Sequence, residues 1–270
     1  MDLALLIFRY EQVHGAADNA ERRDQLQREI VKVISDDSMS SIYSALCAKF
    51  GWEVDQTLAS EMSECNATEL DDINVKLEDA VKNAGDVEVI DGLFAKAKHH
   101  AKIGNWTDAS ALLDEVIGKK KCSTGKKIDA TMEKAKMALF TMNSKELKEH
   151  VEEAKKLNDA GGDWDRRNRL KVYEAFYQLS VRNVKKASSL FMECVATFTC
   201  TELCTYKQFM FYALVTSVIS LNRNELRKKV INDAHVITVI RDLPSVQLLI
   251  TGVYNCDYAG VFKAVRTRSP

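Results

Sequence analysis

The chain has 270 residues, of which 46% are hydrophobic and 29% are charged, as in ordinary globular proteins. Its 38 basic and 39 acidic side chains nearly cancel, so nucleic-acid binding would need a local basic patch. Only two prolines and 11 glycines interrupt runs rich in Ala, Leu, Glu and Lys. This composition excludes β-sandwiches and barrels, which need many turns, and predicts an almost wholly helical protein.

Residues 1–90 are expected to form an N-terminal helical region. The opening MDLALLIFRYEQ contains an apolar run, but the run is too short to span a bilayer. Asp2 stands where a secretory signal would carry basic residues. We therefore expect a helix with one buried face and no membrane segment. The seven cysteines show no framework spacing, which favours an intracellular protein with reduced thiols.

Four segments align without gaps on an asparagine, and these asparagines follow one another at intervals of 38, 40 and 39 residues. They are Asn105, Asn143, Asn183 and Asn222. Four residues after them come Ala109, Leu147, Ala187 and Leu226, and eight residues before them come Ala97, Ala135, Ala175 and Leu214. Each unit therefore predicts a helix, a turn at the asparagine and a second helix, because Asn caps helices and tolerates left-handed backbone angles. A fifth, weaker match places Asn66 at the same position.

A helical hairpin repeating at this interval is typical of an α-solenoid of tetratricopeptide (TPR)-like repeats. One hairpin cannot bury its apolar faces alone, whereas stacked neighbours bury them together. The fold class is therefore predicted to be all-α, a right-handed superhelical α-solenoid of TPR-like helical hairpins. We place the repeats at residues 91–200 and a further helical part at residues 201–270.

The stretch AGGDWDRRNRLKVYEAFYQL, residues 160–179, raises the question of a site. Gly161 and Gly162 fit a helix end, and Asp163 fits the N-cap of the next helix, with Asp165 in its first turn. The arginines that follow have two interpretations. They form a solvated face with salt bridges to the next hairpin, or they form a docking surface for carboxylates of a partner. The candidate contact surface is Asp163, Trp164, Asp165, Arg166, Arg167 and Arg169, with Trp164 expected to be a packing anchor between hairpins.

No motif predicts catalysis, a cofactor or a metal. The segment GKKKCSTGKK, residues 118–127, departs from P-loop spacing and indicates a basic inter-hairpin loop. A weak phosphate or RNA contact through its lysines, Lys119, Lys120, Lys121, Lys126 and Lys127, is the alternative. Cys194, Cys200 and Cys204 lack the spacing of a zinc site and are expected to be buried thiols. His99 and His100 are adjacent on a helix and do not share a face.

Two long segments carry a family resemblance. GGDWDRRNRLKVYEAFYQLSVRNVKKASSLF and TFTCTELCTYKQFMFYALVTSVISLNRNELRKKVI resemble the lid subunits of the proteasome regulatory particle, of the non-ATPase regulatory subunit 6 type. The resemblance is dense from Gly161 to Val265 and looser over residues 41–55 and 95–104. It implies repeats that lead into a PCI domain, whose helical part would be residues 201–270.

The resemblance also implies a function. Members of this family are non-catalytic scaffolds that contact other lid subunits, including PCI-domain subunits and the deubiquitinase, in ubiquitin-dependent proteolysis in the cytoplasm and nucleus. It implies no small-molecule substrate. Members continue into a winged helix, whereas this chain ends with RTRSP, so we expect the winged helix to be missing. Four origins of the chain remain open: a fragment, a splice product, a truncated gene model or a diverged paralogue. Three other functions also remain open: a subunit of a sibling PCI complex (signalosome or translation initiation type), an RNA-binding PCI module, or an enzyme.

Overall fold

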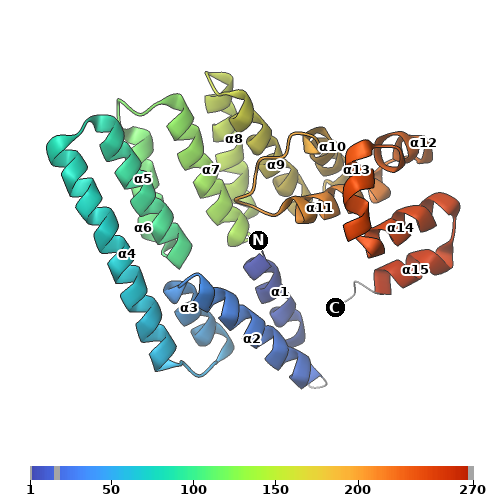
Figure 1. Cartoon of the computed structure of the whole chain (residues 1–270), viewed down its shortest axis with the longest axis horizontal. Coiled ribbons are helices and arrows are strands. Elements are labelled where there is room, and N and C mark those ends of the chain that lie inside the picture. Colours follow the sequence, from blue (N-terminus) through green and yellow to red (C-terminus); the bar gives the residue numbers. More distant parts are fainter. Residues whose placement is uncertain (1, 15–18, 267–270) are drawn as a thin grey trace. The chain divides into compact units, whose positions relative to one another are not determined.

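The computed structural model describes residues 2–14 and 19–266, and every regular element in those residues is helical (Figure 1). The all-α prediction is therefore confirmed. The chain divides into two compact units, residues 1–141 and 142–270. The predicted boundaries at residues 90 and 200, and the right-handed superhelix, stay predictions. None of the described helices combines the length and apolar character needed to cross a membrane.

The first unit holds seven helices in its described residues. They are α1 (Asp2–His14), α2 (Ala20–Asp36), α3 (Ser40–Phe50), α4 (Gln56–Asn83), α5 (Asp86–Ile103), α6 (Trp106–Gly118) and α7 (Thr124–Phe140). Helices α1 to α4 share one apolar core. In it Trp52 donates a hydrogen bond from Nε1 to the hydroxyl of Tyr10 at 2.8 Å, and the ring of Phe50 packs against both. The bond satisfies the polar atoms of these two large rings, of which Tyr10 is buried and Trp52 partly buried.

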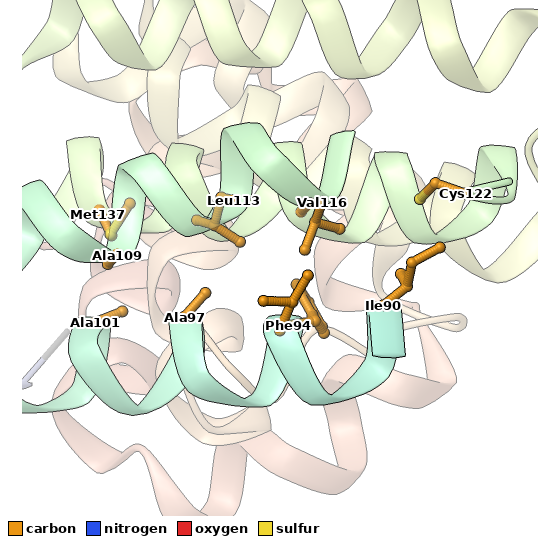
Figure 2. Close-up of a cluster of buried hydrophobic side chains, with 11 residues drawn as sticks. Ile90, Phe94, Ala97, Ala101, Ala109, Leu113, Val116, Cys122 and Met137 are labelled. Carbon is orange, nitrogen blue, oxygen red and sulfur yellow. The ribbon is translucent and has the colours of Figure 1, made fainter. Parts of the chain in front are cut away.

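Helices α5 to α7 share a second core, shown in Figure 2. Ala97 and Ala101 of α5 point toward α6, whose Ala109 and Leu113 point back (Figure 2). Ala97, Ala109 and Leu113 have no accessible surface. Small side chains on both helices let their backbones approach closely, and Leu113 fills the space beside them. The small residues of the repeat therefore lie between paired helices here.

The second unit continues the series. Its described helices are α8 (Ser144–Asp159), α9 (Trp164–Ser180), α10 (Val184–Cys194), α11 (Tyr206–Ser220), α12 (Arg223–Leu226), α13 (Ala234–Val239), α14 (Pro244–Asn255) and α15 (Tyr258–Arg266), with a π-helical turn at Arg227–Ile231 and a 3₁₀ turn at Ile240–Asp242. Helix α10 packs between α9 and α11. Ala175 and Ala187 are fully buried there, and Phe176 meets Phe191 edge to face at 5.3 Å.

The four repeat asparagines all cap helices, as predicted. The side-chain oxygen of each accepts a hydrogen bond from the backbone N–H three residues later, at 2.9 to 3.4 Å. The helices capped in this way begin directly after Asn105, Asn143, Asn183 and Asn222. Each cap satisfies one of the N–H groups that a helix start leaves without a partner.

The left-handed conformation lies one residue earlier than expected. Gly104, Met142 and Arg182, which precede three of the asparagines, have φ of 90°, 56° and 60°. The turn is thus built from a left-handed residue that ends one helix and an Asn that starts the next. The fifth match is wrong, because Asn66 lies inside α4, where its Nδ2 donates to the carbonyl of Ser38 at 2.8 Å.

Candidate protein-contact site

The start of α9 is formed by a tight connection from α8. The N–H of Gly162 donates to the carbonyl of Asn158 at 2.7 Å. A Cβ on Gly162 would lie 1.6 Å from the side-chain oxygen of Asn158, so only glycine fits. Asp163 follows as the N-cap of α9, as predicted, and accepts a hydrogen bond from the N–H of Arg166 at 2.8 Å. The connection therefore places the arginine run at the start of α9.

Arg166 is held within this turn. Its guanidinium donates to Oδ2 of Asp163 at 2.5 Å, while the backbone N–H of Arg166 donates to the other carboxylate oxygen. The backbone hydrogen bond, together with the charge of Arg166, holds the pKa of the Asp163 carboxyl below its usual value. Asp163 and Arg166 thus neutralise each other.

Arg169 reaches the loop between α10 and α11. Its Nε and one terminal nitrogen donate to Oε1 of Glu202 at 2.9 and 2.7 Å, and the hydroxyl of Tyr173 lies 3.5 Å from the same oxygen. Beside this pair, burial and the charge of Glu202 raise the pKa of the Cys200 thiol. Arg169 therefore forms the kind of salt bridge to the next hairpin that the first interpretation predicted.

Trp164, Asp165 and Arg167 remain exposed on the same turn. The expectation that Trp164 is a packing anchor is wrong, because 63% of its surface is exposed. No ion-pair partner of Arg167 is found among the described residues. Of the six candidate residues, one aromatic ring, one acid and one base are thus exposed and take no part in the contacts described above. We call Trp164, Asp165 and Arg167 the α9 corner.

The basic segment at residues 118–127 is only partly a loop, since Thr124 already begins α7, with Ser123 as its N-cap. Lys121 pairs with Asp86, Lys126 lies 2.5 Å from Asp91, and Lys119 lies 2.8 Å from Glu115. Three of its lysines are thus neutralised by acids of the same unit. This arrangement leaves little free charge for a phosphate.

Of the cysteines and histidines considered as ligands, the three cysteines and His99 are buried and His100 is partly buried. Cys194, Cys200 and Cys204 are buried, and burial raises the pKa of the Cys194 thiol to about 11, so it stays protonated at neutral pH. His99 is buried with Nδ1 3.3 Å from a carboxylate oxygen of Glu69, and burial lowers the pKa of His100. In residues 2–14 and 19–266, no group of three potential ligands could hold a metal ion.

One exposed apolar surface was not predicted from the sequence. Tyr258, Phe262 and Val265 lie along one face of α15 and are all more than half exposed. Their spacing of four and three residues is visible in the sequence, but the same spacing marks the buried face of most helices. Sequence pattern alone therefore could not separate this exposed stripe from a core stripe.

Comparison with known sequences decides the family. A sequence model of "26S proteasome subunit RPN7" matches residues 55–229, well over half of the chain, and this range includes the α9 corner and all four repeat asparagines. The chain belongs to this family. The resemblance found in the sequence is thereby confirmed.

Individual members of the family match most of the chain. The "26S proteasome non-ATPase regulatory subunit 6 homolog" of Arabidopsis thaliana is 36% identical over 240 residues, which is 89% of this chain and 62% of the relative. The "26S proteasome non-ATPase regulatory subunit 6" of Dictyostelium discoideum is 36% identical over 236 residues, 87% of this chain and 62% of the relative. The "26S proteasome regulatory subunit RPN7" of Saccharomyces cerevisiae is 29% identical over 266 residues, which is 90% of this chain and 62% of the relative. The chain spans about three fifths of the length of these relatives.

Proposed function

We propose that this chain acts as a non-catalytic scaffold in the lid of the proteasome regulatory particle and supports ubiquitin-dependent protein degradation through contacts with other lid subunits. The observation that carries the proposal is the family match over residues 55–229. Relatives named as proteasome regulatory subunits align over most of the chain. Stacked helical hairpins suit this role, because they present long rows of side chains to partners.

The proposal extends to the organisation of the chain. We assign residues 1–90 to an N-terminal helical region, residues 91–200 to the TPR-like repeats and residues 201–270 to the helical part of a PCI domain. The partners would be PCI-domain and deubiquitinase subunits of the lid, in the cytoplasm and the nucleus. No small-molecule substrate, cofactor or membrane is part of the proposal.

The α9 corner is the contact surface that we propose within this role. Exposed Trp and Arg side chains are the types that most often dominate binding energy in protein interfaces. Trp164 has most of its surface in solvent, and Arg167 lies three residues later, so the two are neighbours on the helix surface. Arg166 and Arg169 are engaged within the chain, so their contribution would be to hold the turn in place.

The test is affinity purification of the tagged 270-residue chain from cells, with quantitative mass spectrometry of proteasome lid subunits. Recovery of these subunits in stoichiometric amounts is expected. Recovery of the bare chain, or of chaperones alone, would overturn the proposal for this chain. The same purification with Trp164→Ala and Arg167→Ala together tests the corner, and we expect at least a tenfold loss, the order of magnitude for removing two interface anchors.

The matched control replaces two exposed residues elsewhere in the second unit, Lys185→Ala with Ile219→Ala. It removes one base and one apolar side chain, as the corner variant does. We expect the control to recover lid subunits like the unaltered chain. An equal loss in both variants would show that the corner has no special part in binding.

A further inference from the structure

A groove of about 570 Å³ lies in the first unit, between one face of α2 and the start of α4. Helix α2 contributes residues from Asp24 to Asp36, spread over more than three turns, and α4 contributes Leu58. Val31 and Leu58 are half-buried and pack against the core of α1 to α4, so they give the groove an apolar floor. An open groove with an apolar floor can accept one more secondary-structure element.

The charges along the groove have a definite order. Asp24, Arg28, Lys32 and Asp36 follow one another at four-residue intervals, so acids occupy both ends and bases occupy the middle. All four side chains are exposed. By helix geometry the two bases lie about 6 Å apart along the axis, and the two acids lie about 18 Å apart. We call these four residues the α2 charge row.

The two central bases are available to a partner. Neither Arg28 nor Lys32 has an ion-pair partner among the residues that the structure describes. Asp24 lies 3.9 Å from Arg23, at the limit of an ion pair. In water, exposed pairs within one helix form and break at little cost. A ligand with opposite charges can therefore engage the row without breaking a stable bridge.

We propose that this groove is a docking site for an amphipathic helix of another protein, with charges in the order basic, acidic, acidic, basic at four-residue intervals. In a helix this interval repeats about every 6 Å, the spacing of Arg28 and Lys32. The acidic pair would meet these two bases, and the outer bases would meet Asp24 and Asp36. An apolar side chain beside the acidic pair would lie on Val31 and Leu58.

The charge order argues against other occupants. A second copy of α2 carries acidic, basic, basic, acidic, so antiparallel pairing centred on the groove would place Asp24 against Asp36 and Arg28 against Lys32, which repels. A nucleic acid would gain from Arg28 and Lys32 but would meet carboxylates at both ends of the groove. A helix with the complementary order is the occupant that satisfies every charge.

The test uses the full chain and two synthetic helical peptides of the same composition. The first carries Lys, Glu, Glu and Lys at four-residue intervals with Leu on the face toward the floor, and the second carries Glu, Lys, Lys and Glu at the same positions. Both have the same net charge, and circular dichroism checks that both are equally helical. By fluorescence anisotropy at low salt we expect the first peptide to bind about tenfold more tightly, as four favourable surface pairs replace four unfavourable ones.

A chain with Asp24→Lys, Arg28→Glu, Lys32→Glu and Asp36→Lys together has the same net charge and a reversed row. It should prefer the second peptide by a similar factor, and its melting curve shows whether it folds. As a folded control, Lys76→Glu with Lys120→Glu changes two exposed lysines outside the groove and should leave the preference unchanged. Equal binding of both peptides, or the same preference in the reversed chain, would overturn the proposal.

A photo-cross-linker in place of Gln27, which also lines the groove, would identify the natural occupant in cell extracts. A cross-linked segment that is helical and carries the complementary order supports the proposal. A cross-link to nucleic acid, to another copy of this chain, or to a segment without the acidic pair would overturn it.

Discussion

Arg169 on α9 donates two hydrogen bonds to a single carboxylate oxygen of Glu202, which lies in the loop between α10 and α11. Both side chains are about three quarters buried. The pair fixes this loop against the helix that carries the α9 corner. Arg169 therefore contributes to the fold, while Arg167, two residues earlier, faces solvent.

Arg169→Ala should lower the free energy of unfolding by about 1–3 kcal/mol. The reason is that Glu202 would keep a partly buried charge after losing both hydrogen bonds from the guanidinium. Arg167→Ala serves as the control and should change stability by less than about 0.5 kcal/mol, because its side chain is exposed. Urea unfolding followed by circular dichroism measures both. Equal losses of unfolding free energy from the two substitutions would contradict the assignment of Arg169 to the fold and of Arg167 to the exposed surface.

Glu174 predicts a pH dependence of stability. Its side chain is 10% exposed and lies 2.7 Å from Lys155 on α8 and 3.0 Å from Lys186 on α10. Burial alone would raise the pKa of this carboxyl, but the hydrogen bonds and charges of the two lysines outweigh burial and lower it. A lowered pKa means that the stabilisation is fully present above the unfolded value of about 4.3 and is lost as pH falls through the folded value.

Glu174→Gln should therefore destabilise the second unit at pH 7 by about 1–2 kcal/mol, and the difference from the unaltered chain should shrink as pH falls below about 4. Thermal melting at several pH values measures this difference. Glu193→Gln, which alters an exposed pair with Lys171 at 3.0 Å, should show a much smaller effect at every pH. If the stability difference between Glu174→Gln and the unaltered chain grew as the pH fell, the pKa of Glu174 would not be lowered in the folded chain.

Features set by a few consecutive residues could be predicted from the sequence, whereas contacts between distant residues could not. A cap depends on the asparagine and the three residues after it, so the helix starts at Asn105 and Asn183 followed from the sequence. The partner of Arg169 lies 33 residues away, and nothing in the arginine run marks Glu202 as that partner. The exposure of Trp164 depends on which helices pack against the start of α9, and the residues around Trp164 do not carry that information.

The residue before the capping asparagine has the left-handed conformation. Two substitutions at this position of the repeat should therefore have opposite effects on stability. Arg182 has φ of 60°, a conformation that costs a side chain about 1–2 kcal/mol, so Arg182→Gly should raise stability by about 0.5–1 kcal/mol after the greater chain entropy of glycine is counted. Gly104→Ala should lower stability by about 1–3 kcal/mol, because φ is 90° and the new Cβ would lie 2.4 Å from Ile42. Chemical denaturation measures both. Destabilisation by Arg182→Gly would mean that its side chain contributes more than the strain.

The repeat alignment predicts that equivalent small residues have equivalent roles. Ala109 on α6 and Ala187 on α10 each stand four residues after a capping asparagine, and both have no accessible surface; Ala175 on α9 is equally buried. Replacing any of the three with Phe should lower the free energy of unfolding by about 1–3 kcal/mol, because close-packed helices have no room for a ring.

Ala111→Phe is the matched control for Ala109→Phe, since it makes the same change two residues later on the exposed side of the same helix. We expect it to alter stability by less than about 0.5 kcal/mol. Differential scanning calorimetry compares the variants. Unchanged melting of Ala187→Phe would contradict the alignment. It would mean that residue 187 faces solvent, whereas the repeat predicts that it contacts a neighbouring helix. Equal destabilisation by Ala111→Phe would instead assign the loss to the helix propensity of Phe rather than to packing.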